Sequence, residues 1–359
     1  MTSEDFIKRR KRVMSDLQET SSYLDQGAEE AARVHNLMIN TRSALDSLDQ
    51  EFKERTGLTT TDTAFLFLAI GLQIARQYLL KNDQFRLTAN QGDVLMENIL
   101  SLTPPTCQEV LTQSVPYDAI KTGVHVSDTG IAGTTHRYRT LGHDPILGWV
   151  FGTANIMTNS LTKTNLETYQ VKNMTIVRHY PLGVTGMLDR AVHFGLDDPV
   201  LFAASVGRQA VHFGSDYFTK QGLPIPIIPS IDNNLAKSML TRWNIDAYSV
   251  SRGAAIATFI NTMIALAHGL FFDGVTEMDR KTYEVRTRKI LSYSNLVTTS
   301  SNLVVVGVTQ DFSKLDLGGA AVTIYRLIQN INFIKKVKEE FVFGSFKDMI
   351  RGNDDWMYR

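Results

Sequence analysis

The chain has 359 residues, of which 43% are hydrophobic and 21% charged, and its 37 basic residues balance its 37 acidic ones. This balance argues against a nucleic-acid-binding protein, because such proteins carry a basic excess, so we expect no specific nucleic-acid partner. The single cysteine, Cys107, excludes an intramolecular disulfide framework and a thiolate zinc site. The basic N-terminus is not followed by an apolar stretch, so we expect a cytoplasmic protein without a secretory signal.

Residues 1–56 form a charged region with an apolar residue at every seventh position. The repeat consists of Leu17, Leu24, Ala31, Met38, Leu45 and Phe52. Such a heptad stripe predicts one long helix, or a helical hairpin broken at Gly27, that packs against a partner along the stripe. We therefore expect this region to form a helix-mediated oligomer.

Residues 57–230 are expected to form a central helical domain that contains an unusual loop region. Residues 59–80 begin with Thr and Asp caps and continue apolar, which is typical of a buried helix. Residues 115–162 are instead rich in Gly, Thr, His and Asp, with few helix formers before Pro145. Functional residues are often carried on such polar loops, so this region is the first candidate for a site.

Residues 231–359 return to a helical pattern and are expected to pack on the central domain. Within them, residues 253–272 carry no formal charge and are long enough to cross a bilayer. The stretch also contains Thr258, Asn261 and His268, which are costly in lipid unless they find partners. Two interpretations stay open: a helix buried inside a soluble protein, or a contact that places the protein at the membrane periphery.

The sequence shows no alternation of strands and helices and no glycine-rich nucleotide-binding motif. Residues 300–308, SSNLVVVGV, are the one strand-like stretch. The predicted fold is mainly α, a multi-helix bundle with a long N-terminal helix or helical hairpin and a polar Gly/Thr-rich loop region in the middle.

The phrase AVHFGxD occurs twice in the chain. On a helix, residues four apart lie on one face, so His193 is expected to point the same way as Asp197. The second copy pairs His212 with Asp216 in the same manner. An imidazole and a carboxylate one turn apart can hold one divalent ion together. The alternative is that the pairs are hydrogen-bonded core residues and that the repeat arose by chance.

The central loop contains HRYRTLGHDP, which starts at His136, and the second copy of the phrase continues as HFGSDYFTKQGLP, which starts at His212. Together these segments resemble a His-Arg-x-x-Thr-His box followed by His-x-x-x-Asp-x-x-Thr-x-x-Gly-x-Pro. That pattern is typical of bacterial membrane-associated metal-dependent hydrolases of the LexA-regulated type. The resemblance covers these two short boxes, and the first box has two extra residues between its threonine and its last histidine.

The resemblance implies four metal ligands, which are His136, His143, His212 and Asp216. The repeat adds His193 and Asp197 as further candidate ligands. Asp144 is implied as another ligand or a base, although Asp before Pro is also a good helix N-cap. Arg137 and Arg139 would hold an anionic group such as a phosphate, or else pair with surface acids. Nitrogen and oxygen ligands without thiolates suit Zn, Mn or Mg.

These residues predict a metal-dependent hydrolase of a phosphoester, with a small molecule, a nucleotide or a lipid as the substrate class. The metal would polarise a phosphoryl oxygen and lower the pKa of bound water. The alternative is a non-enzymatic helical protein of a bacterial or mobile-element system, either an assembly component or a membrane-acting effector. Convergence of the four implied ligands in one coordination sphere would favour the hydrolase, and their dispersal would favour the alternative.

Overall fold

The computed structural model describes residues 3–79, 86, 88, 91, 94, 98, 101–102, 105–124, 126–220, 222–274 and 279–352. Over these residues the fold is mainly α, as predicted. The chain forms two compact units. The first unit combines Met1–Phe67, Met263–Tyr293 and Tyr325–Arg359, and the second combines Leu68–Thr262 and Ser294–Ile324. Both units thus join distant segments, whereas the expected regions 1–56, 57–230 and 231–359 are each contiguous.

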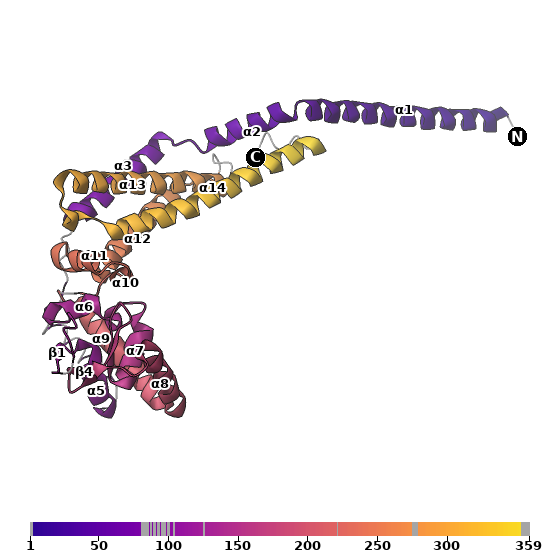
Figure 1. The fold of residues 1–359 in the computed structure, drawn as a ribbon. Coiled ribbons are helices and arrows are strands. Elements are labelled where there is room, and N and C mark those ends of the chain that lie inside the picture. Colours follow the sequence, from indigo (N-terminus) through magenta and orange to yellow (C-terminus); the bar gives the residue numbers. More distant parts are fainter. Residues whose placement is uncertain are drawn as a thin grey trace. The chain divides into compact units, whose positions relative to one another are not determined.

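A long helix opens the chain and appears in indigo in Figure 1. This helix, α1 (Ser3–Ile39), continues through Gly27, so the long-helix prediction is confirmed and the break at Gly27 is wrong. One glycine inside a helix costs about 1 kcal/mol, which is too little to interrupt so long a helix. The second helix, α2 (Thr41–Arg55), begins after Asn40.

The heptad stripe is buried only at its C-terminal end. Phe52 is buried and packs with Val285 and Val337 in the core of the first unit. Leu17 and Leu24 are exposed along α1. Within the described part of this chain, the N-terminal half of the stripe therefore stays open to solvent.

Four long helices contribute to both units: α3 (Thr60–Leu79), α12 (Ala247–Gly269), α13 (Arg280–Thr309) and α14 (Leu317–Arg351). In the first unit their interior holds a polar network around His268. Its Nε2 lies 2.7 Å from Asp62 Oδ1, and its Nδ1 lies 2.8 Å from Thr287 Oγ1. Burial raises the pKa of Asp62, but hydrogen bonds from Thr59 and His268 outweigh burial, and the net shift is downward.

The same helices also have a polar interior in the second unit. Asn261 Oδ1 accepts hydrogen bonds from Gln73 Nε2 at 3.1 Å and from Asn295 Nδ2 at 3.0 Å. Arg76 and Asp316 form a buried ion pair next to them. Apolar side chains, including Phe259 and Val304, lie on the outside.

The stretch 300–308 lies within the helix α13, so the strand expected there is wrong. The preference of β-branched residues for strands is weak, and their tertiary packing can place them in a helix.

The uncharged stretch 253–272 lies mostly in α12. This helix is long and apolar enough to cross a membrane, yet only 17% of its most apolar window is buried. A second candidate span is the bent pair α2 and α3. The interpretation of residues 253–272 as a helix buried within this chain is therefore wrong.

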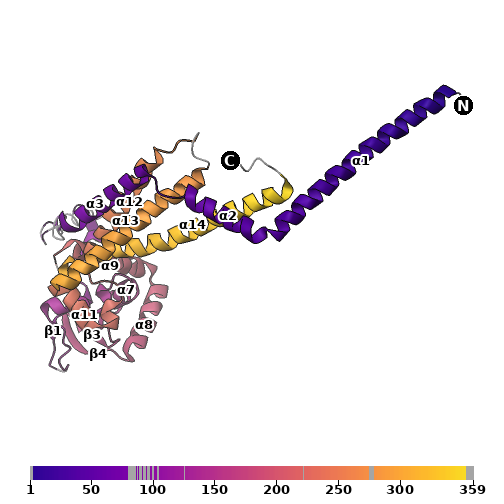
Figure 2. The ribbon, with the colours of Figure 1, turned by 90° about the horizontal axis from the view of Figure 1, so that it is seen from above.

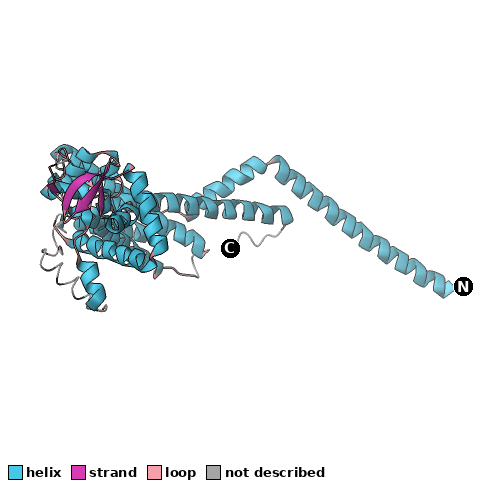
Figure 3. Cartoon of the chain, turned by 60° about the horizontal axis from the view of Figure 1, so that its bottom comes forward, coloured by secondary structure: helices cyan, strands magenta, loops and turns pink. Residues whose placement is uncertain are grey.

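The middle of the second unit combines short helices with a small sheet, which Figure 3 shows in magenta. The sheet has the order β1-β4-β3-β2, in which β1 pairs with β4 in parallel and the other pairs are antiparallel. Its strands are β1 (Lys121–Thr122), β2 (Ser160–Thr162), β3 (Thr168–Lys172) and β4 (Thr175–His179). Asn173 and Met174 have positive φ, which suits the tight turn between β3 and β4.

The helical elements of this part follow in chain order. They are α5 (Pro105–Thr112), η1 (Pro116–Asp118), η2 (Gly133–Thr135), α6 (His136–Arg139), η3 (Leu141–His143), α7 (Gly148–Thr158), α8 (Gly183–Asp197), α9 (Pro199–Phe218), α10 (Ile228–Ile231), α11 (Asn233–Lys237), the π-helix η4 (Ser238–Arg242) and η5 (Phe312–Lys314). Figures 1 and 2 show α7, α8 and α9 side by side, and all three contact one another.

Glycines on α7 let α9 approach closely. A Cβ on Gly148 would lie 2.5 Å from Phe213 Cζ, and one on Gly152 would lie 2.6 Å from Gln209 Cδ. Both neighbours are on α9, so any larger residue on this face of α7 would push the helices apart. This contact sets the rotation of α9, and with it the direction in which His212 points.

Candidate metal centre

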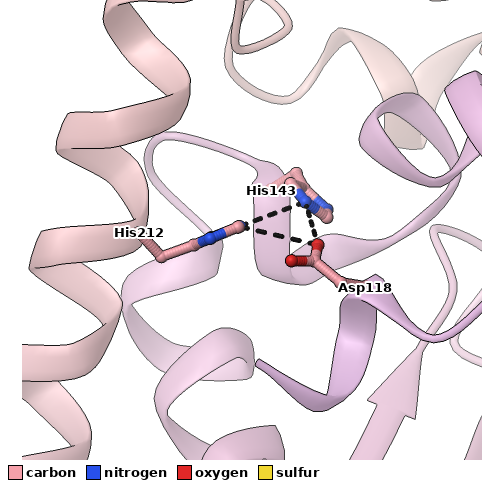
Figure 4. A group of neighbouring side chains, drawn as sticks. All are labelled: Asp118, His143 and His212. Atoms are coloured by element: carbon pink, nitrogen blue, oxygen red, sulfur yellow. Dashed lines mark hydrogen bonds and ion pairs between the residues drawn. The ribbon is translucent and has the colours of Figure 1, made fainter. Parts of the chain in front are cut away.

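Three side chains from separate elements point toward one another in the second unit (Figure 4). Asp118 ends η1, His143 ends η3, and His212 lies on α9. One possible ligand atom of each lies within 4.8 Å of the other two. Two imidazole nitrogens and a carboxylate oxygen at this spacing can hold one divalent ion.

The distances within this cluster are short. His143 Nε2 lies 2.9 Å from Asp118 Oδ1 and 3.2 Å from His212 Nε2. His212 Nε2 lies 3.7 Å from Asp118 Oδ1.

Two further side chains face the cluster. His136 Nε2 lies 3.7 Å from Asp118 Oδ1. Asp216 Oδ2 lies 3.4 Å from His212 Nε2 and 3.6 Å from His143 Nε2. Nitrogen and oxygen donors of three side chains thus lie close enough to hold one ion, and His136 and Asp216 lie next to them.

The hydrogen-bond network sets the tautomer of His143. The Thr140 hydroxyl donates to the His136 carbonyl at 2.9 Å. Its oxygen, 2.6 Å from His143 Nδ1, must therefore accept a hydrogen bond from that nitrogen. The lone pair of His143 Nε2 then points into the cluster, where a metal ion would need it.

Two buried carboxylate oxygens lack a hydrogen-bond donor within the described part of the chain. They are Asp118 Oδ1 and Asp216 Oδ2, and both face imidazole nitrogens. A buried acceptor without a donor is costly, and here it also stands against nitrogen lone pairs. A cation between these atoms would remove that cost, so the residues fit a divalent metal.

The electrostatics of the cluster hold His143 and Asp118 in the protonation states that bind metal ions. Burial lowers the pKa of His143 to about 4, although the neighbouring Asp118 opposes the shift, so the ring is neutral near pH 7. Burial raises the pKa of Asp118, but the imidazoles of His212 and His143 beside it outweigh burial and leave the pKa well below its usual range. A neutral imidazole and an ionised carboxylate are the forms that bind metals.

Asp216 is held by an arginine of the first sequence box. Arg137 Nη2 donates to Asp216 Oδ1 at 2.8 Å, while Nη1 donates to Thr219 Oγ1 at 3.2 Å and to the Gly222 carbonyl at 3.0 Å. Gly222 has a φ of +51°, and a Cβ there would collide with Asp246. The Thr and Gly of the second box therefore serve to anchor Arg137, which orients Asp216.

Tyr117 forms the wall behind the histidines. Its buried ring packs edge-on against His143 and His212, with centroids 5.0 and 5.3 Å away. Its hydroxyl donates to Gln209 Oε1 at 2.5 Å, and Gln209 Nε2 donates to the Gly142 carbonyl at 2.9 Å. This packing restricts both imidazole rings before any metal binds.

The structure brings together four of the side chains singled out in the sequence. They are His136, His143, His212 and Asp216. It does not bring His193 and Asp197 to them. Both lie on α8 and face solvent, and the contact of His193 is Asp189, 3.7 Å away.

Three other candidates have partners outside the cluster. Asp144 Oδ1 accepts from the amides of Ile146 and Leu147, both at 2.9 Å, and Oδ2 accepts from the amide of Ile227 at 2.5 Å. Asp144 therefore caps the chain where it enters α7. Arg139 donates to the Gly130 carbonyl at 2.8 Å, and Arg137 is engaged by Asp216.

Asp118 was missed in the sequence, although it lies within the polar stretch 115–162. The sequence signal that could have identified Asp118 is its position directly after Pro116-Tyr117, because Tyr117 is buried in the structure. No spacing rule connects it to His143 or His212, because the connection runs through the packing of Tyr117.

No known protein family, curated protein or solved structure matches this chain.

Proposed function

We propose that this protein is a metal-dependent hydrolase of a phosphoester. The observation that carries the proposal is the convergence of Asp118, His143 and His212 from three separate elements, with His136 and Asp216 beside them. Zn or Mn suits such a mixed nitrogen and oxygen set, and Mg is the third candidate. A bound divalent ion would act as a Lewis acid and make water a better nucleophile.

The protein's own residues have distinct roles in this proposal. His143 is held neutral by burial and oriented by Thr140, so it binds rather than transfers a proton. Asp216 has one oxygen held by Arg137 and the other free of donors. That free oxygen can accept a proton from an attacking water. We assign the base to Asp216 instead of Asp144, because both Asp144 oxygens already cap backbone amides.

Substrate reaches the cluster from one side. The His143 side chain is fully buried, whereas the side chains of Asp118, His136 and His212 are 27%, 17% and 16% exposed. The metal would thus have protein on the His143 side and solvent on the other. An open side is what distinguishes a catalytic metal site from a closed structural one.

The two sequence boxes support the proposed relationship to the LexA-regulated type of hydrolase. Their histidines and Asp216 converge, and the intervening Arg137, Thr140, Thr219 and Gly222 each have a contact that positions a candidate ligand. The two extra residues of the first box are Leu141 and Gly142, which belong to η3 and place His143 toward the cluster.

The proposal is tested by metal analysis of the untagged protein, with the repeat as an internal control. The first variant carries Asp118→Ala and His212→Ala, and the control carries His193→Ala and Asp197→Ala. We expect about one equivalent of metal in the wild type and the control, and none in the first variant. Melting curves with added Mg²⁺ and Mn²⁺ would reveal a weakly held ion, and hydrolysis of a chromogenic phosphodiester should follow the metal. A wild type that neither retains metal nor responds to it would overturn the proposal.

A second candidate function, contact with a lipid membrane, is favoured by the long helices. Their interior is polar, as the contacts of Gln73, Asn261 and Asn295 demonstrate, while apolar side chains lie outside. Apolar side chains on the outside are unfavourable in water and favourable in the hydrocarbon of a membrane. We propose that α12 contacts the membrane and that the hydrolase works at its surface, where a lipid phosphoester would be within reach.

Vesicle flotation tests this second candidate. We expect the wild type to float with vesicles of phosphatidylcholine and phosphatidylglycerol, and a Phe259→Ser/Leu266→Ser variant to float much less. Val192→Ser/Leu196→Ser removes exposed apolar residues of α8 and should change nothing. If the wild type forms a stable oligomer and does not bind vesicles, other copies of the chain cover the apolar face of α12 instead.

The open half of the heptad stripe supports the proposal of a helix-mediated oligomer. Leu17 and Leu24 are exposed on α1 at positions seven apart, as in a coiled-coil seam. Light scattering on the wild type and on a Leu17→Ser/Leu24→Ser variant tests it. A monomeric wild type would contradict it.

A further inference from the structure

The face of α9 that carries the candidate ligands also carries an arginine. Arg208 precedes His212 by four residues and Asp216 by eight, so all three lie along one side of the helix. Arg208 interacts electrostatically with Tyr117 and Asp118, the residues of η1 that line and enter the cluster. Arg208 therefore lies one helical turn from a candidate ligand, on the same side of α9.

One contact fixes this side chain. Arg208 Nε donates to the Gln113 carbonyl at 2.8 Å, in the segment that leads to Tyr117 and Asp118. The side chain is half-buried, and burial lowers the pKa of Arg208 while Tyr117 and Asp118 oppose the shift. An arginine stays protonated even so, because its pKa starts above about 12.

Within the described residues, the two terminal NH₂ groups of Arg208 have no protein partner. Over the described residues, no carboxylate lies within 4.0 Å of this guanidinium, and Nη1 and Nη2 donate to no acceptor. The two arginines of the first sequence box differ in this respect. Arg137 is occupied by Asp216 and the α9 C-terminal turn, and Arg139 donates to the Gly130 carbonyl.

The charges of the site favour an anion next to Arg208. Arg137 forms an ion pair with Asp216, whereas among the described residues no arginine or lysine pairs with Asp118. A divalent ion would exceed the charge of Asp118, and Arg208, which interacts electrostatically with Asp118, adds another positive charge. Two terminal NH₂ groups of one guanidinium match two oxygens of a phosphate.

We propose that Arg208 binds the non-bridging oxygens of the substrate's phosphate group, and that the substrate is therefore an anionic phosphoester with its phosphate between Arg208 and the metal cluster. This inference rests on the proposed function and names the residue that recognises the substrate. It transfers to Arg208 the anion-binding role that the sequence had indicated for Arg137 and Arg139.

Calorimetric titration with inorganic phosphate tests the inference, with and without Mn²⁺. We expect Arg208→Gln to weaken phosphate binding about 10- to 100-fold, because charged hydrogen bonds are lost. Arg208→Lys should restore part of the affinity, since lysine keeps the positive charge but cannot donate two parallel hydrogen bonds to two phosphate oxygens. Arg190→Gln is the matched control, an exposed arginine of α8 that lies over Phe194, and it should bind phosphate as the wild type does.

Metal content and melting temperature are measured on the same samples. If Arg208→Gln keeps its metal and fold and binds phosphate as tightly as the wild type, the inference is wrong and the proposed function stands. If the wild type neither retains metal nor responds to added Mg²⁺ or Mn²⁺, the proposed function fails; phosphate binding that still depends on Arg208 would then support Arg208 as an anion-binding residue without a metal. Absence of phosphate binding in the wild type overturns the inference. If Arg208→Gln does not fold, Arg208→Lys is used instead: weaker phosphate binding than the wild type supports the inference, and equal binding overturns it.

Discussion

On α8, His193 and Asp197 face solvent, whereas on α9 the same residue types, His212 and Asp216, face candidate ligands from other elements. The two copies of AVHFGxD have the same helical conformation and nearly the same residues. They differ in rotation. The first copy buries its alanine, Ala191, while the second exposes its own and buries Phe213 and Asp216.

The difference teaches that a ligand pair on a helix is defined by what the helix packs against. Ala191 contacts the cluster formed by Ala154, Tyr180 and Met187, and this packing turns His193 outward. The glycine face of α7 receives Phe213, and that contact turns His212 inward. Making the same substitution in the candidate site and in α8 therefore tests whether only the site residues affect metal binding.

The largest effect is expected from His143→Ala, compared with His193→Ala. His143 is completely buried and contributes a central nitrogen of the cluster, so we expect metal affinity to fall by more than about 100-fold. His193→Ala should leave metal affinity and melting temperature unchanged. Competition with a chromogenic chelator measures both variants. Equal metal affinity in the two would remove His143 from the metal site.

A smaller effect is expected from Asp216→Asn, compared with Asp197→Asn. Asp216 lies beside His212 and is held by Arg137, so we expect a 10- to 100-fold loss of metal affinity or activity. The second substitution lies in solvent and should have no effect. Arg137→Gln should resemble Asp216→Asn, because it leaves the carboxylate without its partner. Wild-type behaviour of Asp216→Asn would exclude Asp216 from the site.

The pH dependence of stability in metal-free protein distinguishes the buried His143 from the solvent-facing His193. His143 has a pKa of about 4 in the folded state and about 6.5 when unfolded, so the unfolded state takes up more protons between these values. Stability should therefore fall as the pH drops from about 6.5 to about 4, by up to about 3 kcal/mol from this residue. Urea unfolding of His143→Gln should show a shallower decline, and His193→Gln should follow the wild type. An unchanged slope in His143→Gln would contradict the assignment.

The smallest effect concerns Asp144, which lies next to His143 in the sequence. Asp144→Ala leaves three backbone amides in and beside the turn before α7 without their acceptor, so we expect a loss of about 1 to 3 kcal/mol in unfolding free energy. Metal affinity should stay within about twofold of wild type. A large loss of metal at unchanged stability would instead make Asp144 a ligand.

Much of the local structure could be predicted from the sequence. The heptad pattern predicted the long N-terminal helix, and the Thr and Asp caps predicted the start of α3, where Thr59 and Asp62 accept hydrogen bonds from each other's backbone amides. The short strands were missed, because segments of two to five residues carry little periodic signal. Asp118 was missed because no local pattern joins it to the histidines.

The sequence by itself determined which residues could ligate and which of them share a helix face, since residue type and the spacing of four are local properties of the chain. Only the tertiary structure decided between the two copies of the phrase. Close packing at Gly148 and Gly152 rotates α9 so that His212 meets His143, and Tyr117 brings Asp118 to them. These contacts join segments that lie far apart along the chain, and no pattern within either segment specifies them.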